Sequence, residues 1–318
     1  MTKFQVTILG CGSAMPTTLH NPPSQLVDLN EKLFMIDCGE GTQLQMRKFK
    51  ARLSKLHSLF ISHLHGDHIF GLPGLLSTLS LLGRTGDLNI YAHKEIDFLL
   101  SPLLSYMGSH MSFRINLIPL NPDSHELLFE NRSVKVSSFP LKHRIATNGF
   151  LFEEKETPRH IMREMIDFYR IPIKQIQQIR EGDDFVTADG TLVKNELLTY
   201  PGTPAKRYAY CSDTAYAPEI IPYIEQVDLL YHEATFAESE LARAGETWHS
   251  TARQAAEIAR AANVKKLIIG HYSSRYSEIG TLLKEAVAVF PHTLLATEGQ
   301  IIDVNEEDSA LTDNSSHP

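Results

Sequence analysis

The chain has 318 residues, of which 42% are hydrophobic and 21% charged, and its acidic side chains outnumber the basic ones to give a net charge of −8. This composition is that of a globular protein with one large α/β domain or two small ones, and it excludes a generally basic nucleic-acid-binding protein while leaving room for a local basic patch. No apolar run approaches the length that spans a membrane. The three cysteines are scattered without a CxxC pair, which favours a reducing, cytoplasmic environment over a disulfide framework.

The first third of the chain begins with strand patterns. Alternating apolar residues predict a strand over residues 4–9, and residues 25–29 and 32–37 flank Asn30-Glu31 as a hairpin. A glycine-rich loop, Asp37-Cys38-Gly39-Glu40-Gly41, follows. Residues 42–55 then predict a helix with five basic side chains and no acidic one. Such a run is typical of a solvated face, but it also suits contact with phosphates.

Three histidines and an aspartate follow a short buried strand predicted over residues 58–62. Their order is His63, His65, Asp67, His68. Alternate side chains of an extended segment share a face, so His63 and His65 can hold one ion, while Asp67 and His68 in the following turn suit a second ion close by. Imidazoles and a carboxylate without a thiolate favour zinc or a similar metal in a hydrolytic site. The plainer alternative, surface histidines at a strand end, does not explain four ligand-type residues in this order.

The HxHxDH motif and the DCGEG loop before it resemble the metallo-β-lactamase superfamily. The resemblance implies an α/β fold, namely an αβ/βα sandwich of two mixed sheets flanked by helices, with a one- or two-metal site at the sheet edge. It also requires three further ligands at strand ends, and candidates follow the strands predicted over residues 134–140, 207–211 and 266–269. The implied ligands of the first zinc are His63, His65, His143 and Asp213, and those of the second are Asp67, His68, Asp213 and His271.

Two segments between these strands have their own character. Residues 72–82 predict a helix that is apolar all round, so we expect it to be buried in the core or against a partner subunit. Residues 153–206 break the pattern, with short helices predicted over residues 158–169 and 176–180 and a hairpin around Asp189-Gly190. We expect this insertion to be an arm within an otherwise single domain spanning residues 1–318, and we expect the acidic end, residues 305–318, to fray. Between residues 157 and 180 the arm has two acidic side chains and five basic ones, Arg159, Arg163, Arg170, Lys174 and Arg180.

Two further motifs narrow the function. His232-Glu233-Ala234-Thr235 and His249-Ser250-Thr251 resemble the HEAT and HST motifs of the ribonuclease Z family, endonucleases that trim tRNA 3′ ends. Cleaving a P–O3′ bond expels an alkoxide that needs a proton, and an imidazole at His249 polarised by Glu233 can supply it. A helix is predicted to end near Arg243, with a loop through Gly245, and the spacing of Thr251 and Gln254 predicts a capping box just after His249. By itself, His249 could also be a helix-cap neighbour without chemistry.

The resemblance to ribonuclease Z covers residues 4–304. It implies a zinc-dependent endoribonuclease that removes the 3′ trailer from precursor tRNA and leaves a tRNA 3′-hydroxyl and a trailer 5′-phosphate. It further implies that Asp67 takes the proton of the attacking water or orients the hydroxide while it ligates zinc. It also implies that two zinc ions bind per subunit and that homodimers pack through the first helices. No membrane or DNA partner is expected. The family's PAKxRN loop is replaced here by Pro16-Thr17-Thr18-Leu19-His20-Asn21, and Ile173-Lys174 stands where the family's arm has a Gly-Pro pair.

Two other functions fit the same motifs. One is a small-molecule hydrolase of this fold, such as a phosphodiesterase, which would need neither the arm nor Glu233. The other is a non-catalytic RNA-binding member of the superfamily, although such proteins are expected to have lost ligands that this chain keeps. Preferences for the trailer or for a terminal CCA, the metal loaded in the cell, and side activities on small phosphodiesters are not encoded in these motifs.

Overall fold

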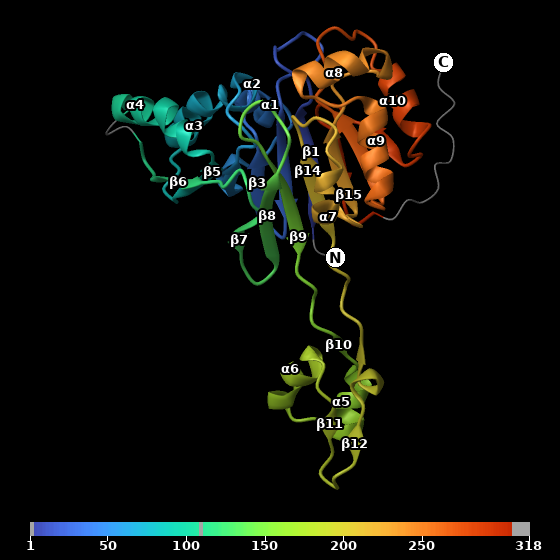
Figure 1. The fold of residues 1–318 in the computed structure, drawn as a ribbon. Helices are drawn as coiled ribbons and strands as arrows, with labels where there is room; N and C mark the ends of the chain where they lie inside the picture. Colours follow the sequence, from blue (N-terminus) through green and yellow to red (C-terminus); the bar gives the residue numbers. More distant parts are fainter. Residues whose placement is uncertain (1–2, 108–110, 307–318) are drawn as a thin grey trace, which may run out of the picture. The chain divides into compact units, whose positions relative to one another are not determined.

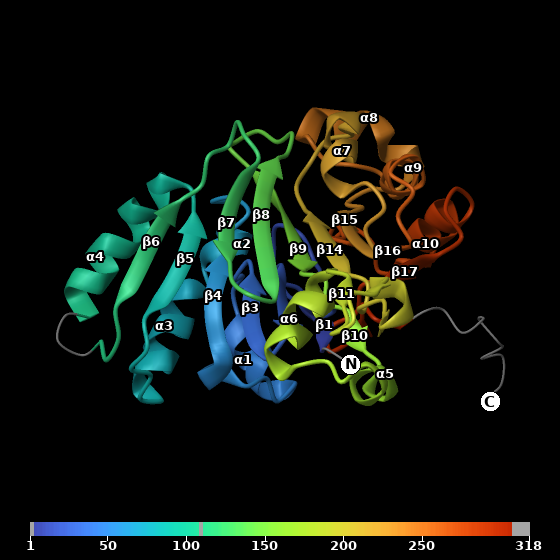
Figure 2. The same cartoon turned by 90° about the horizontal axis from the view of Figure 1, so that it is seen from below.

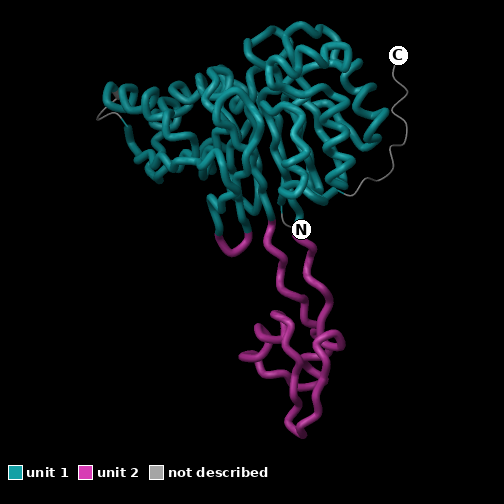
Figure 3. The backbone as a smooth tube through the Cα atoms, in the orientation of Figure 1, with its two compact units in different colours: residues 1–130, 134–153, 206–318 teal, residues 131–133, 154–205 magenta. Residues whose placement is uncertain are grey.

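The computed structural model describes residues 3–107 and 111–306, which form two compact units (Figure 3). Unit 1 comprises residues 1–130, 134–153 and 206–318, and unit 2 comprises residues 131–133 and 154–205. The acidic end from residue 307 onward lies outside the described residues. Within the described ranges, no helix combines the length and apolar character needed to cross a bilayer.

The first sheet of unit 1 has seven strands in the order β18-β1-β2-β3-β4-β5-β6 among the described residues (Figure 1). Pairing is antiparallel from β18 to β3 and parallel from β3 to β6. The strands are β1 (Phe4–Gly10), β2 (Ser24–Leu29), β3 (Lys32–Ile36), β4 (Leu56–Phe60), β5 (Leu88–Ala92), β6 (Ile115–Pro119) and β18 (Ile301–Asp303).

The second sheet also has seven described strands, in the order β17-β16-β15-β14-β9-β8-β7. Strands β14 to β17 are parallel to one another, and β9 is antiparallel to β14. The strands are β7 (Glu126–Glu130), β8 (Val134–Pro140), β9 (Asn148–Glu154), β14 (Arg207–Cys211), β15 (Leu229–Glu233), β16 (Lys266–Gly270) and β17 (Thr293–Leu295).

The two sheets pack against each other through the inner faces of their strands. On β3, Phe34 and Ile36 join the core between the sheets, whereas Met35 joins a second core with the helices, as the two-residue period of a strand requires. The ring of Phe34 lies 5.8 Å from that of Phe152 on β9. The predicted sandwich of two mixed sheets is therefore confirmed.

Helices flank both sheets of unit 1 (Figure 2). Leu72, Leu75, Leu76 and Leu79 of α3 are buried, as the apolar pattern predicts, and they pack in the core that contains Met35. The helices are α1 (Thr42–Lys48), α2 (Gly66–Ile69), α3 (Leu72–Leu81), α4 (Asp97–Met107), α7 (Ile221–Ile224), α8 (Leu241–Thr247), α9 (Ala252–Ala261) and α10 (Gly280–Val287), with 3₁₀ turns at Leu53–Lys55, Lys94–Ile96, Pro218–Ile220 and Glu238–Glu240.

Unit 2 has a small core of its own. Its buried members are Ile171, Ile179, Phe185, Val193 and Leu198. Two antiparallel pairs of short strands, β10 with β13 and β11 with β12, accompany two helices. The elements are β10 (His160–Ile161), α5 (Arg163–Tyr169), α6 (Ile173–Glu181), β11 (Phe185–Val186), β12 (Leu192–Val193), β13 (Thr199–Tyr200) and a 3₁₀ turn at Asn195–Leu197.

Three predicted helical limits are wrong. The helix predicted over residues 42–55 ends at Lys48, because the chain reverses at Lys50, which has a φ of 55° and donates its N–H to the carbonyl of Arg47. Residues 158–162 are not helical, since β10 pairs with the distant β13. The loop predicted through Gly245 is instead part of α8.

The sequence patterns also do not predict β6, β7, β17, β18 or α10.

Candidate metal centre and active site

Four ligand-type side chains meet at the ends of β4, β8 and β14. His63 and His65 follow β4, His143 follows β8 and Asp213 follows β14, and one donor atom of each lies within 4.8 Å of the others. Nε2 of His63 is 2.9 Å from Nδ1 of His65 and 3.5 Å from Oδ2 of Asp213. Ligands of one tetrahedral zinc ion are about 3.3 Å apart, given metal–ligand bonds of about 2.0–2.1 Å. The four donors therefore have the spacing of a single coordination shell.

A second cluster lies beside the first and shares Asp213 with it. Asp67, His68 and His271 bring their donor atoms together in the same way. Oδ1 of Asp213 is 3.2 Å from Nε2 of His68 and 3.1 Å from Nε2 of His271, while its Oδ2 faces the first cluster. Asp213 thus has the geometry of a carboxylate that bridges two ions.

The backbone at this site is held in an uncommon conformation. Asp37, Asp213 and His271 all have positive φ angles, of 55°, 56° and 62°. Non-glycine residues in this region cost of order 1–3 kcal/mol each and gather where function requires a side chain to be aimed. The three residues occupy the turns that follow β3, β14 and β16.

Partners outside the two clusters fix the orientation of the histidine rings. Nδ1 of His68 is 2.8 Å from Oδ2 of Asp37, Nδ1 of His143 is 2.9 Å from the carbonyl of Trp248, and Nδ1 of His271 is 2.9 Å from Oγ1 of Thr235. An N–H donated through Nδ1 leaves Nε2 as the lone-pair nitrogen, and in each ring this atom faces the other donors of its cluster. The structure therefore presets the tautomer of three ligands.

The donor set fits divalent metal ions. Nε2 of His68 and Nε2 of His271 are buried and make no hydrogen bond within the described part of the chain, an arrangement that a metal ion would satisfy. Burial lowers the pKa of His63, His65 and His143, which keeps these imidazoles neutral and able to coordinate. Imidazole nitrogens and carboxylate oxygens without sulfur suit zinc.

The carboxylates add a strong attraction for cations. Burial alone would raise the pKa of Asp213, but His271 and His68 outweigh it and lower that pKa well below its usual value. Burial would likewise lower the pKa of His68, yet Asp213, Asp37 and Asp67 together raise it. The same negative charges that favour a proton on His68 also favour a metal ion in its place.

A buried carboxylate orients a further histidine next to the two clusters. Oε1 of Glu233 lies 2.8 Å from Nδ1 of His249. Burial would lower the pKa of His249, but the charge and hydrogen bond of Glu233 outweigh it and raise the pKa to about 9. Thr235 links this pair to the metal cluster, since its hydroxyl donates to Oε2 of Glu233 at 2.6 Å and therefore accepts from Nδ1 of His271.

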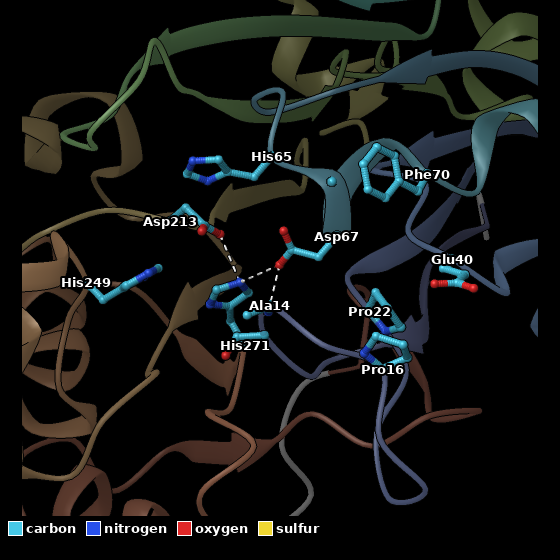
Figure 4. A pocket seen from close by; sticks show the side chains of 12 residues that line it. Ala14, Pro16, Pro22, Glu40, His65, Asp67, Phe70, Asp213, His249 and His271 are labelled. Atoms are coloured by element: carbon cyan, nitrogen blue, oxygen red, sulfur yellow. Dashed lines mark hydrogen bonds and ion pairs between the residues drawn. The ribbon is translucent and has the colours of Figure 1, made fainter. Parts of the chain in front are cut away.

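These groups open into a pocket of about 570 Å³ (Figure 4). Asp67 lines this pocket, and its Oδ2 accepts a 2.8 Å hydrogen bond from the backbone N–H of Ala14. The pocket is lined by Ser13, Ala14, Pro16, Pro22, Glu40, His65, Gly66, Asp67, Phe70, Asp213, His249 and His271. An open pocket of this size admits a substrate to the atoms that the clusters would activate.

The structure brings together the nine residues predicted for metal binding and catalysis.

The five predicted RNA-binding cations lie in unit 2 and differ in their surroundings. Nε of Arg159 donates to Oγ1 of Thr199 at 2.7 Å, and Arg180 donates to the carbonyl of Arg159. Arg163, Arg170 and Lys174 are exposed.

The sequence patterns missed the groups that support the site. Asp37, Thr235 and the carbonyl of Trp248 orient ligands, and the N–H of Ala14 orients Asp67. Asp37 and Thr235 stand inside the DCGEG and HEAT motifs, so the motifs held a signal for them. A backbone N–H or carbonyl carries no signal in residue identity.

The fold and these clusters define the class of the protein, a metallo-β-lactamase superfamily hydrolase with His and Asp groups able to bind metal. The model of the beta-lactamase superfamily domain matches residues 197–272, and the model of the anti-Pycsar protein Apyc1 matches residues 4–157. The solved structure of human tRNase Z, short form, is 24% identical with a TM-score of 0.68, and the match covers 95% of this chain and 100% of that one.

Full-length relatives identify the family within that class. Ribonuclease Z of Parabacteroides distasonis is 56% identical over 304 residues, covering 96% of this chain and all of the relative. Ribonuclease Z of Porphyromonas gingivalis is 53% identical with the same coverage. The chain belongs to the ribonuclease Z family.

Proposed function

We propose that this protein is a two-zinc endoribonuclease that removes the 3′ trailer from precursor tRNA, leaving a 3′-hydroxyl on the tRNA and a 5′-phosphate on the trailer. The observation that carries the proposal is the 2.8 Å contact between Glu233 and His249, next to Asp213, which faces both clusters. A phosphodiester with an alkoxide leaving group needs a proton donor at this place. Membership of the ribonuclease Z family supports the choice of substrate.

The two clusters would hold the two ions. His63, His65 and His143 would bind the first, His68, His271 and Asp67 the second, and Asp213 both. Two zinc ions held there would act as Lewis acids and supply a hydroxide nucleophile at neutral pH.

The side chains of the pocket would divide the proton transfers between them. Asp67 faces the pocket with its Oδ2 held by Ala14, so it would orient the attacking water or take its proton. His249 would give a proton to the departing O3′ through Nε2, because Nδ1 is occupied by Glu233. The buried carboxylate of Glu233 would stabilise the protonated ring before the transfer.

Unit 2 and the outer helices supply candidate contacts beyond the pocket. We infer that Arg163, Arg170 and Lys174, which are exposed, meet tRNA phosphates. Leu81, which is 85% exposed, and Leu82 leave apolar surface at the end of α3, which supports a homodimer packed through this region. Three free, buried thiols support a cytoplasmic location.

The proposal is tested by incubating zinc-loaded protein with an end-labelled precursor tRNA and with bis(p-nitrophenyl) phosphate, and by mapping the RNA ends. A single cut beside the acceptor stem, with a 3′-hydroxyl on the tRNA, is expected. Hydrolysis of the small diester alone would favour a small-molecule phosphodiesterase. Binding of tRNA without any cleavage, by protein that lacks zinc, would favour a non-catalytic member of the superfamily.

A further inference from the structure

One wall of the active-site pocket has no part in the chemistry described above. Phe70, Pro16 and Pro22 line the pocket together with the polar groups (Figure 4). Phe70 is aromatic and lines the pocket, yet it leaves 62% of its surface exposed. A large ring exposed in this way next to two proline rings is a suitable surface for a flat ligand.

The ring of Phe70 is held against the backbone of the metal-binding turn. A Cβ atom on Gly66 would lie 2.3 Å from Cε2 of Phe70. A side chain at position 66 would therefore force the ring to move from its place, one turn of α2 from Asp67. The position of the exposed face is thus coupled to the position of the metal-binding turn.

The place of Phe70 relative to His249 assigns the part of the substrate that it meets. Figure 4 shows His249 and Phe70 on opposite sides of Asp67 and His271. If His249 protonates O3′ of the last tRNA nucleotide, the scissile phosphate lies between His249 and Phe70. The RNA strand continues from this phosphate into the first trailer nucleotide. That nucleotide therefore extends toward Phe70, and a pocket of about 570 Å³ has room for it.

We propose that Phe70, on the pocket wall that it shares with Pro16 and Pro22, forms a stacking subsite for the base of the first trailer nucleotide. The inference rests on the proposed function and names the substrate group that the apolar wall binds. Stacking on an aromatic ring is tolerant of base identity, because every base has a π-face, and it is worth about 5- to 150-fold in binding per base. The subsite would hold the trailer in register at the metals without reading its sequence.

The test combines protein variants with substrates that lack one base. Wild type, Phe70→Leu and Phe70→Trp would be compared on three precursor tRNAs, which are intact, abasic at the first trailer nucleotide, or abasic at the last tRNA nucleotide. Phe70→Leu keeps apolar bulk but removes the ring, whereas Phe70→Trp keeps a ring. Zinc content and the midpoint of thermal unfolding would check that each variant is folded and retains its metal site.

We expect Phe70→Leu to raise KM for the intact substrate about 10-fold or more with little change in kcat, and Phe70→Trp to restore it. Removing the first trailer base should cost wild type a similar factor and cost Phe70→Leu almost nothing further, because both changes delete the same contact. If Phe70→Leu and removal of the first trailer base each reduced binding independently, so that their effects multiplied, the proposal would be overturned. It would also be overturned if the effect of Phe70→Leu depended on the last tRNA base instead of the first trailer base. Failure of wild type to cut even the intact substrate would identify the proposed function itself as wrong.

Discussion

Nδ1 of His249 lies 2.8 Å from Oε1 of Glu233, a carboxylate that is fully buried. The same carboxylate accepts hydrogen bonds from the backbone N–H groups of Thr214 and Ser250, at 2.8 and 3.1 Å. With its position fixed by these donors, Glu233 aims the ring of His249 and favours its protonated form. The pairing turns an ordinary histidine into an acid that is charged at neutral pH.

The first prediction concerns the pH dependence of cleavage. The acid form of His249 is required, and Glu233 raises the pKa of His249 to about 9 against the lowering effect of burial. The rate should therefore persist at neutral pH and fall as the pH rises through the pKa of His249 in the folded protein. This pKa should lie at or below about 9, because bound zinc ions would lower it somewhat. Glu233→Gln should move the alkaline fall to lower pH, as measured by kcat/KM profiles. An unchanged alkaline limb of the pH profile would show that Glu233 does not raise the pKa of His249.

A second prediction concerns Asp37. Its Oδ2 orients His68 through a 2.8 Å hydrogen bond and also accepts from the hydroxyl of Tyr210 at 2.8 Å. Asp37→Asn should weaken binding of the metal at His68 by about 10- to 100-fold, measured by competition with a chelator. Tyr210→Phe is the matched control, because it removes the hydrogen bond from Tyr210 to Asp37 but keeps the hydrogen bond between Asp37 and His68. Equal metal affinity in Asp37→Asn and wild type would mean that the contact does not support the ligand.

A third prediction concerns unit 2. Replacing Arg163, Arg170 and Lys174 together with alanine should weaken tRNA binding. In a plot of the logarithm of the tRNA association constant against the logarithm of the salt concentration, the slope should become less steep by up to about 3. Hydrolysis of bis(p-nitrophenyl) phosphate should not change. Arg159→Ala serves as a contrast, because Arg159 is bonded inside unit 2 to Thr199 and should act through the stability of that unit. An unaltered salt slope in the triple variant would place the RNA contacts elsewhere.

A fourth prediction concerns the thiols. Cys11, Cys38 and Cys211 are buried and free. Burial raises the pKa of all three, that of Cys38 to about 12, so thiolate is scarce at pH 8 and only thiolate reacts. Ellman's reagent should label no thiol rapidly in folded protein and three in denaturant. A thiol that reacts rapidly in the native state would contradict the burial described here.

The sequence predicted the parts of this site that are encoded in short segments. His63, His65, Asp67 and His68 stand together in one motif, and the remaining ligands each follow an apolar strand, so their convergence at a sheet edge was predictable. The pairing of Glu233 with His249 was also predictable, because both belong to recognisable motifs and the chemistry needs a proton donor.

What the sequence did not predict depends on contacts between distant segments. Asp37 and Tyr210 are 173 positions apart and meet only because the two sheets pack face to face. The local pattern predicts helix at β10, whose partner β13 lies about 40 residues away, and tertiary pairing overrides this local propensity. The turn at Lys50 has no glycine to mark its positive φ, so the sequence pattern predicts a helix that continues beyond the observed end of α1.

The central claim is that His249 protonates the departing O3′, and a change of leaving group tests it most directly. Wild type and His249→Ala, both zinc-loaded, would be compared under single turnover on precursor tRNA and on the same RNA with sulfur in place of the bridging O3′. A thiolate leaves without a proton, so His249→Ala should lose about 10²- to 10⁴-fold on the oxygen substrate and little on the sulfur substrate. An equal loss on both substrates would contradict the assignment of His249 as the acid.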